Sequence, residues 1–117
     1  MSMNKREVGT LYEDMACRYL EDEGLKIIGR NYRVKIGEID IIAMENDTLV
    51  FAEVKFRSST DYGGAEFAIS RQKQKKIMRV AQWYMAECGI RSDTVCRFDA
   101  VLIDGQDVVH IRNAWQL

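Results

Sequence analysis

Two strand-like segments in the middle of the chain limit its fold more than any other feature. Residues 36–45 and 48–57 are rich in β-branched and aromatic side chains, and only Asn46 and Asp47 separate them, which predicts a β-hairpin with a tight turn. Residues 49–56 are apolar at most positions, on both faces of the predicted strand. Such a strand is typical of the buried centre of a sheet that is covered on both sides.

The covering elements follow from hydrophobic periodicity. Apolar residues recur every three or four positions in residues 8–20 and 77–88, which predicts two amphipathic helices, and a glycine lies just beyond the end of each. Ser70 is the expected N-cap of the second helix. Three more strands are predicted at residues 25–33, 95–103 and 108–112, the last two forming a hairpin. The predicted order αβββαββ is an α/β fold in which helices flank a mixed sheet, formed by one domain over residues 1–117.

The composition excludes several classes of protein. Seventeen Lys and Arg face eighteen Asp and Glu, so the chain is not a uniformly basic nucleic-acid binder, and any phosphate-binding surface must be local. Three cysteines without Cys-x-x-Cys spacing argue against a disulfide framework and against a zinc knuckle. No segment approaches the roughly 18 apolar residues of a membrane helix. We therefore expect a soluble cytoplasmic protein without a membrane partner.

Charge is segregated along the chain. Residues 38–54 contain five acidic residues and no Lys or Arg, whereas residues 55–79 contain seven basic and two acidic residues. Residues 1–37 contain seven basic and six acidic residues. An acidic segment thus lies between two flanks that carry many basic residues.

The predicted hairpin brings carboxylates of the acidic segment together. A symmetric turn at Asn46-Asp47 pairs Asp40 with Glu53 and Glu38 with Lys55, on one face of the sheet, with paired Cβ atoms roughly 5 Å apart. Like charges on a buried strand are costly, so we expect a cation to neutralise them. Mg²⁺ or Mn²⁺ is suitable, because Mg²⁺ takes one or two protein carboxylates and keeps several waters. The alternative is a solvent-facing strand pair with surface salt bridges.

These residues point to metal-assisted hydrolysis of phosphodiester bonds. Asp40 and Glu53 would ligate the metal, and Lys55 would orient or deprotonate a metal-bound water. Basic residues gather at the start of the second helix, where the helix dipole favours anions, and its apolar stripe, extended by one turn, turns Lys73 and Gln74 inward. A solvated basic helix face is the alternative. The predicted nucleic-acid-binding rim consists of Arg30, Arg33, Lys35, Arg57, Lys73, Gln74 and Lys76.

Several segments together resemble a known family. They are GTLYEDMACRYL at residues 9–20, NYR at 31–33, GEIDII at 37–42, FAEVKFR at 51–57 and RFDAV at 97–101. In this combination the chain resembles the YraN-type proteins, a bacterial family of unestablished role. That family is similar to the PD-(D/E)XK nuclease superfamily, especially to Holliday-junction resolvases. The resemblance covers nearly the whole chain and implies a restriction-endonuclease-like core, a nucleic-acid substrate, with branched DNA as a candidate, and the option of a symmetric homodimer.

The resemblance also implies roles for individual residues. Ile39 replaces the proline of the superfamily motif, a substitution that leaves the chemistry intact. For Glu13, an ordinary exposed helical glutamate is an equal alternative. The implied roles are Asp40 as the motif aspartate, Glu53 as its second acid, Lys55 as its lysine, the Val54 carbonyl as a further metal ligand, and Glu13 as the helical glutamate that joins the metal site.

Two other hypotheses remain open. The first is a non-catalytic nucleic-acid-binding or protein-docking module on the same fold, and the second is a generic structural partner, which leaves the carboxylates unexplained. Other residues have no function that the sequence decides. They are His110, expected to be structural; Trp83, Trp115 and Tyr62, each able to pack in the fold or contact a partner; and Arg97 and Asp99, which either support the site or form a structural pair.

Overall fold

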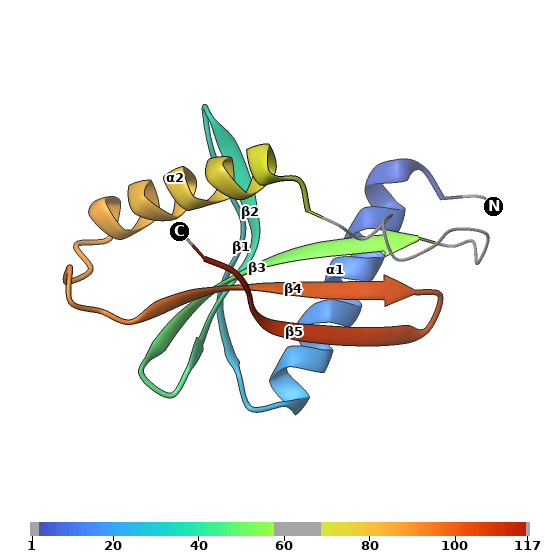
Figure 1. The fold of residues 1–117 in the computed structure, drawn as a ribbon. Helices are drawn as coiled ribbons and strands as arrows, with labels where there is room; N and C mark the ends of the chain where they lie inside the picture. Colours follow the sequence, from blue (N-terminus) through green and yellow to red (C-terminus); the bar gives the residue numbers. More distant parts are fainter. Residues whose placement is uncertain (1–2, 58–68, 117) are drawn as a thin grey trace.

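Two helices cover opposite faces of a five-stranded sheet in the computed structural model, which describes residues 3–57 and 69–116 (Figure 1). The predicted α/β class, with a mixed sheet flanked by helices, is confirmed. Tyr62 lies outside the described residues. In chain order the elements are α1 (Lys5–Asp22), β1 (Lys26–Val34), β2 (Gly37–Glu45), β3 (Thr48–Arg57), α2 (Arg71–Glu87), β4 (Cys96–Asp104) and β5 (Asp107–Trp115).

Local sequence signals set the ends of both helices. The side chain of Ser70 caps α2 as expected, since its oxygen accepts a hydrogen bond from the backbone N–H of Lys73 at 3.1 Å. Asn4 caps α1 in the same way. Gly24 and Gly89 follow the helices with φ of 99° and 64°, which glycine adopts without strain. In the described residues neither helix has the length and apolar character needed to cross a bilayer.

The strands lie side by side in the order β1-β2-β3-β4-β5. β3 and β4 are parallel, and the other neighbours are antiparallel. Because parallel neighbours need a crossover connection, the segment that carries α2 crosses one face of the sheet between β3 and β4. This crossover places the basic start of α2 above the strands that carry the acidic segment.

β3 is buried on both faces, as its sequence predicts. Val50 and Ala52 pack in the core beneath α1, whereas Leu49 and Phe51 pack in the core beneath α2. All four side chains are at most 1% exposed. A charged residue on this strand therefore lies in apolar surroundings unless the neighbouring elements supply a partner.

The last strand is longer than its sequence predicts. β5 continues to Trp115, which stacks on Phe98 with ring centroids 5.5 Å apart. Between Phe98 and Ala100 the pairing with β5 shifts register, and Asn113 adopts a φ of 55° within the irregularity. The backbone N–H of Asn113 donates a hydrogen bond to the buried carboxylate of Asp99. This long-range contact holds a bulge that local sequence does not reveal.

Candidate functional site

The site begins where β2 and β3 separate. Their pairing follows the predicted register from Glu45 and Thr48 to Ile41 and Ala52 and then ends. The next residue, Asp40, turns its carboxylate into the gap, where Oδ2 accepts a hydrogen bond from the backbone N–H of Val54 at 2.8 Å. The side chain thus satisfies a backbone donor that a neighbouring strand would otherwise satisfy.

Asp40 and Glu53 form a pair of buried carboxylates. Asp40 is 8% exposed and Glu53 is 4% exposed. Burial, together with the negative charge of Glu53 and a hydrogen bond with it, raises the pKa of Asp40 to about 7, against the opposing hydrogen bond from Val54. A carboxyl group whose pKa is raised by burial and by a second carboxylate is typical of functional sites.

Lys73 supplies the cation for this pair. It lies in the first turn of α2, and its Nζ is 2.9 Å from Oε1 of Glu53. Burial lowers the pKa of Lys73, but the hydrogen bond with Glu53 and the charges of Glu53 and Asp40 outweigh burial and raise this pKa above its ordinary value. The sequence placed Lys73 on the inward face of α2 for binding phosphate and missed its ion pair with Glu53.

Lys55 and Glu38 are arranged differently from the prediction. The expected pair between them is wrong, because β2 and β3 no longer pair beyond Ile41. Glu38 instead faces β1, where Arg33 Nη2 lies 2.9 Å from its Oε2. Lys55 forms no ion pair within residues 3–57 and 69–116. The ammonium group on the carboxylate pair is that of Lys73, while a role for Lys55 in activating water stays a prediction.

Glu13 lies at the edge of the site. Its side chain is 18% exposed, and burial raises its pKa, as does the negative charge of Asp40. The side chain therefore faces the sheet, as one of the two interpretations of the sequence expected. Arg30 Nη2 is 3.6 Å from Glu13 and 2.8 Å from Asp14, so this predicted phosphate ligand is already paired with acids.

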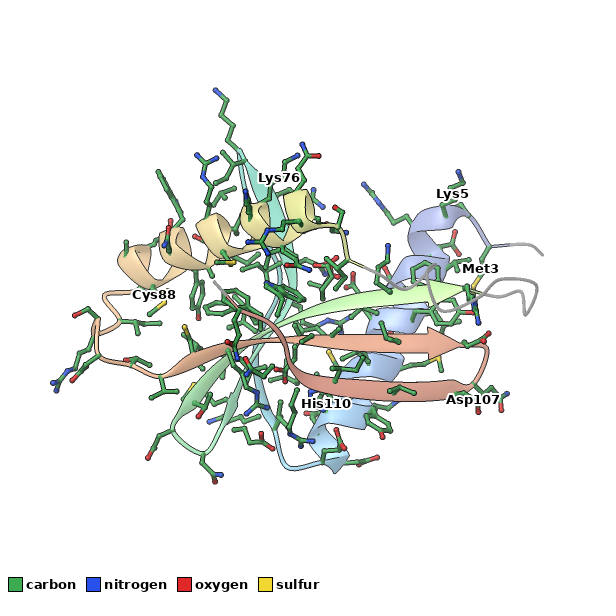
Figure 2. The ribbon with its side chains drawn as sticks, in the orientation of Figure 1. Met3, Lys5, Lys76, Cys88, Asp107 and His110 are labelled. Atoms are coloured by element: carbon green, nitrogen blue, oxygen red, sulfur yellow. The ribbon has the colours of Figure 1, made fainter. Side chains whose placement is uncertain are left out.

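The other residues of the predicted rim do not lie in one place. Arg57 pairs with Asp104 at 3.0 Å. Gln74 donates a hydrogen bond to the Ile69 carbonyl and lines a separate hollow near Trp115 rather than the carboxylate site. Lys76 lies with Lys73 at a hollow by the start of α2 and projects from the helix on the side away from β4 and β5 (Figure 2). Of the rim, only Arg33, Lys35 and Lys73 join Asp40 and Glu53 in one cleft.

This cleft has a volume of about 390 Å³. Its walls come from the turn between β1 and β2, from the separated ends of β2 and β3, and from Lys73 of α2. In residues 3–57 and 69–116, no three His, Cys, Asp or Glu side chains are grouped so as to hold a metal ion. Asp40 and Glu53 are therefore the buried carboxylates that the cleft offers a cation. Glu38 also lines the cleft but is paired with Arg33, and Glu13 lies outside its lining.

A second cluster of charged side chains, which we call the β4–β5 network, lies outside the lining of the cleft. The side chain of His110 on β5 (Figure 2) is 1% exposed, and its two ring nitrogens lie 2.6 Å from Glu23 and 2.7 Å from Asp99. Burial lowers the pKa of His110, but the two hydrogen-bonded carboxylates outweigh it and raise the pKa. The expectation that His110 is structural agrees with this geometry. The network consists of Glu23, Glu45, Arg97, Asp99, His110 and Arg112.

Arg97 and Asp99 belong to this network rather than to the cleft. Arg97 donates hydrogen bonds to Asp99 and to Glu45, the shortest at 2.6 Å. Hydrogen bonds from Arg112 and Arg97 lower the pKa of Glu45 to about 2. Burial raises the pKa of Asp99, but its hydrogen bonds with His110, Arg97 and the Asn113 N–H lower it further than burial raises it. The Arg97–Asp99 pair is one of the two alternatives that the sequence left open. Their other partners, Glu45 and His110, come from other parts of the chain, and no local pattern predicts them.

Known proteins with similar sequences share one family description. The profile of the family described as "Uncharacterised protein family UPF0102" matches residues 12–103. A UPF0102 protein of Lachnoclostridium phytofermentans is 42% identical over 113 residues, covering 97% of this chain and 96% of its own. A UPF0102 protein of Desulfosudis oleivorans is 43% identical over 117 residues, covering 98% and 94%. One of Aliivibrio salmonicida is 45% identical over 114 residues, covering 95% and 93%.

Proposed function

Because the chain belongs to the uncharacterised family UPF0102 and its relatives' names give no activity, we propose a function from its own site: metal-dependent hydrolysis of phosphodiester bonds in nucleic acid, with DNA as the favoured substrate. The observation that carries the proposal is the buried Asp40–Glu53 pair in an open cleft, with the pKa of Asp40 raised to about 7. The proposal includes a restriction-endonuclease-like core for the α/β fold, in line with the sequence motifs.

The donor set fits Mg²⁺ or Mn²⁺. Mg²⁺ prefers carboxylate oxygens, takes one or two of them from the protein and keeps several waters, so the two acids in a cleft of about 390 Å³ meet its needs. Asp40 and Glu53 would hold the ion, with the Val54 carbonyl as a further ligand. When bound, the ion would act as a Lewis acid toward a phosphoryl oxygen and lower the pKa of a coordinated water.

The chain's own residues position the substrate and move protons. Lys73 is half-exposed, so its ammonium group can turn from Glu53 toward a phosphate at the mouth of the cleft. Lys35, which lines the same cleft, adds a second cation for the nucleic-acid backbone. We assign Lys55 to orienting the attacking water. Glu13, at the edge of the site, would assist in holding the metal ion.

One observation favours a second function, binding without catalysis. The Lys73–Glu53 ion pair, at 2.9 Å, already neutralises one buried acid without a metal. A non-catalytic nucleic-acid-binding or protein-docking module would keep this pair permanently. Such a module binds its partner equally well with and without a divalent cation, and the Glu53→Gln substitution leaves its affinity unchanged.

Cleavage assays distinguish these functions. Wild type, Asp40→Asn and Glu53→Gln are incubated with linear duplex, single-stranded and branched DNA, each with Mn²⁺ or with a chelator. Asp93→Asn is the matched control, because the Asp93 side chain is 68% exposed and, within residues 3–57 and 69–116, forms an ion pair with the neighbouring Arg91 alone. We expect metal-dependent cleavage by wild type and Asp93→Asn alone. Cleavage by Asp40→Asn at the wild-type rate, or no cleavage of any substrate by wild type, contradicts the proposal.

A further inference from the structure

An apolar groove lies next to the carboxylate cleft. Its volume is about 470 Å³, and it lies between the turn joining β1 and β2 and the outer side of α2. Trp83 is 58% exposed there, and Ile36 is 38% exposed. A largely exposed indole is unusual for a residue that only stabilises a fold, since tryptophan is highly buried on average. We call this feature the Trp83 groove; its walls are Val34, Lys35, Ile36, Arg79, Gln82, Trp83 and Ala86.

The Trp83 groove and the carboxylate cleft share a wall. Val34, Lys35 and Ile36 line both of them, so only the turn between β1 and β2 separates the two. Figure 1 shows this turn rising beside α2. Lys73 and Trp83 are ten residues apart on that helix, which corresponds to about 15 Å along its axis. A short nucleic-acid strand that lies in the cleft can therefore continue past the turn into the groove.

The charge around the Trp83 groove selects an anionic occupant. Residues 71–86 contain five Lys and Arg and no acid. Of these five, only Lys73 has an ion pair with another residue of the described ranges 3–57 and 69–116. Lys35 and Arg79, which border the indole, likewise have no ion pair there. Sites that bind single-stranded nucleic acid combine two components, cationic side chains for the phosphates and an exposed aromatic ring on which a base stacks.

Other occupants fit less well. A second copy of the chain docking through the same face would bring its basic helix against this one, which like charge opposes. A purely apolar peptide would leave Lys35 and Arg79 without partners. A nucleotide strand satisfies both features, because its phosphates pair with the cations and its bases have flat apolar faces.

We propose that the Trp83 groove binds unpaired nucleotides next to the scissile bond, with one base stacked on the indole of Trp83 and the adjacent phosphates on Lys35 and Arg79. This inference rests on the proposed function for its substrate, and it adds a preference for substrates that carry a single-stranded segment. Trp83 is then a substrate-binding residue, although it is remote from the carboxylate pair.

The fluorescence of tryptophan reports the stacking directly. The chain has two tryptophans, and Trp115 is only 7% exposed and stacks on Phe98 in the core. Titrating the full chain with a short deoxythymidine oligonucleotide, in the presence of a chelator so that no cleavage occurs, is expected to quench the solvent-exposed emission. The Trp83→Ala variant should lose the quenching and bind roughly five- to 150-fold more weakly, and Trp83→Phe should recover part of the affinity.

Controls make the result specific to the groove. Val109→Ala removes a 54% exposed apolar side chain on β5 and should bind like wild type. An oligonucleotide of abasic sites should bind wild type about as weakly as the deoxythymidine oligonucleotide binds Trp83→Ala. Equal affinity of wild type and Trp83→Ala overturns the proposal, and so does quenching by an acidic peptide that matches quenching by DNA.

The same samples separate this inference from the proposed function. If wild type cleaves DNA with Mn²⁺ and Trp83→Ala binds DNA as tightly as wild type, the groove proposal is contradicted and the hydrolase proposal stands. If DNA quenches wild type and binds Trp83→Ala more weakly, but wild type cleaves no substrate, the groove stands as a binding site and the hydrolase proposal is contradicted. No binding of any oligonucleotide by wild type overturns the groove proposal.

Discussion

Replacing Asp40 by asparagine is expected to stabilise the protein at neutral and alkaline pH. Asparagine keeps an oxygen that can accept the hydrogen bond from the Val54 N–H. It removes the negative charge that faces Glu53 in a buried position. The substitution therefore removes an electrostatic penalty without removing the backbone contact.

The size of the penalty follows from the pKa. Asp40 titrates at about 7 in the fold against an ordinary value of 3.8, so between these values the folded protein holds a proton that the unfolded chain has lost. Stability therefore falls as pH rises through this window. The loss is about 2 kcal/mol at about pH 5 and about 4 kcal/mol at about pH 8.

Urea denaturation of wild type and Asp40→Asn at these two pH values measures the effect. The advantage of asparagine should grow by about 2–3 kcal/mol between them, and contributions from titrating groups that do not interact with Asp40 cancel in the comparison. Asp93→Asn, at an exposed position, should show no such growth. A difference between wild type and Asp40→Asn that does not change with pH refutes the reasoning, because the carboxylate would then titrate as in water. Added Mg²⁺ should stabilise wild type and leave Asp40→Asn unchanged.

Three further predictions concern the ion pairs. Asp99→Ala removes a fully buried acid and should lower the free energy of unfolding in urea by roughly 3–5 kcal/mol, whereas Asp93→Ala at the surface should lower it by about 1 kcal/mol or less; equal losses would contradict the structural role of Asp99. The pKa of His110 is raised, so wild type should have a higher free energy of unfolding than His110→Gln. This difference should be full below about pH 6.5 and disappear as pH rises through the pKa of the folded state. An advantage that instead increased with pH would mean that a neutral ring is preferred. Lys73→Met leaves the buried Glu53 without its cation, so thermal unfolding should show a lower melting temperature and a larger gain from Mg²⁺ than in wild type; equal gains would place the cation elsewhere.

Most of the fold could be predicted because its signals are local. The helical stripes, the caps and the turn at Asn46-Asp47 each lie within a few residues of the element that they define. The apolar residues of β3 itself indicate that both of its faces are buried. The extension of β5 to Trp115 could not be predicted in this way. It depends on a contact from Asp99 to the backbone of Asn113, two positions that only the finished sheet brings together.

The site was predictable to the level of the strand register. The register brings Asp40 close to Glu53, but it also implied a pair between Glu38 and Lys55 that does not form. The pairing of β2 and β3 ends at Ile41, because the Asp40 side chain takes the Val54 N–H. Where a strand pair separates depends on one side chain competing with the backbone, and alternation along a strand carries no information about that competition.

The two groups of buried charges differ in a way that argues for a ligand. In the β4–β5 network three acids face two arginines and a histidine with a raised pKa, and the pKa values of Glu45 and Asp99 are lowered. In the cleft, two buried carboxylates have one lysine, and the pKa of Asp40 is raised. Charges selected only for stability are expected to resemble the network, since the fold favours the ionised forms of Glu45 and Asp99. The cleft keeps a surplus negative charge at a cost in stability, and that cost is explained if a bound cation completes the site.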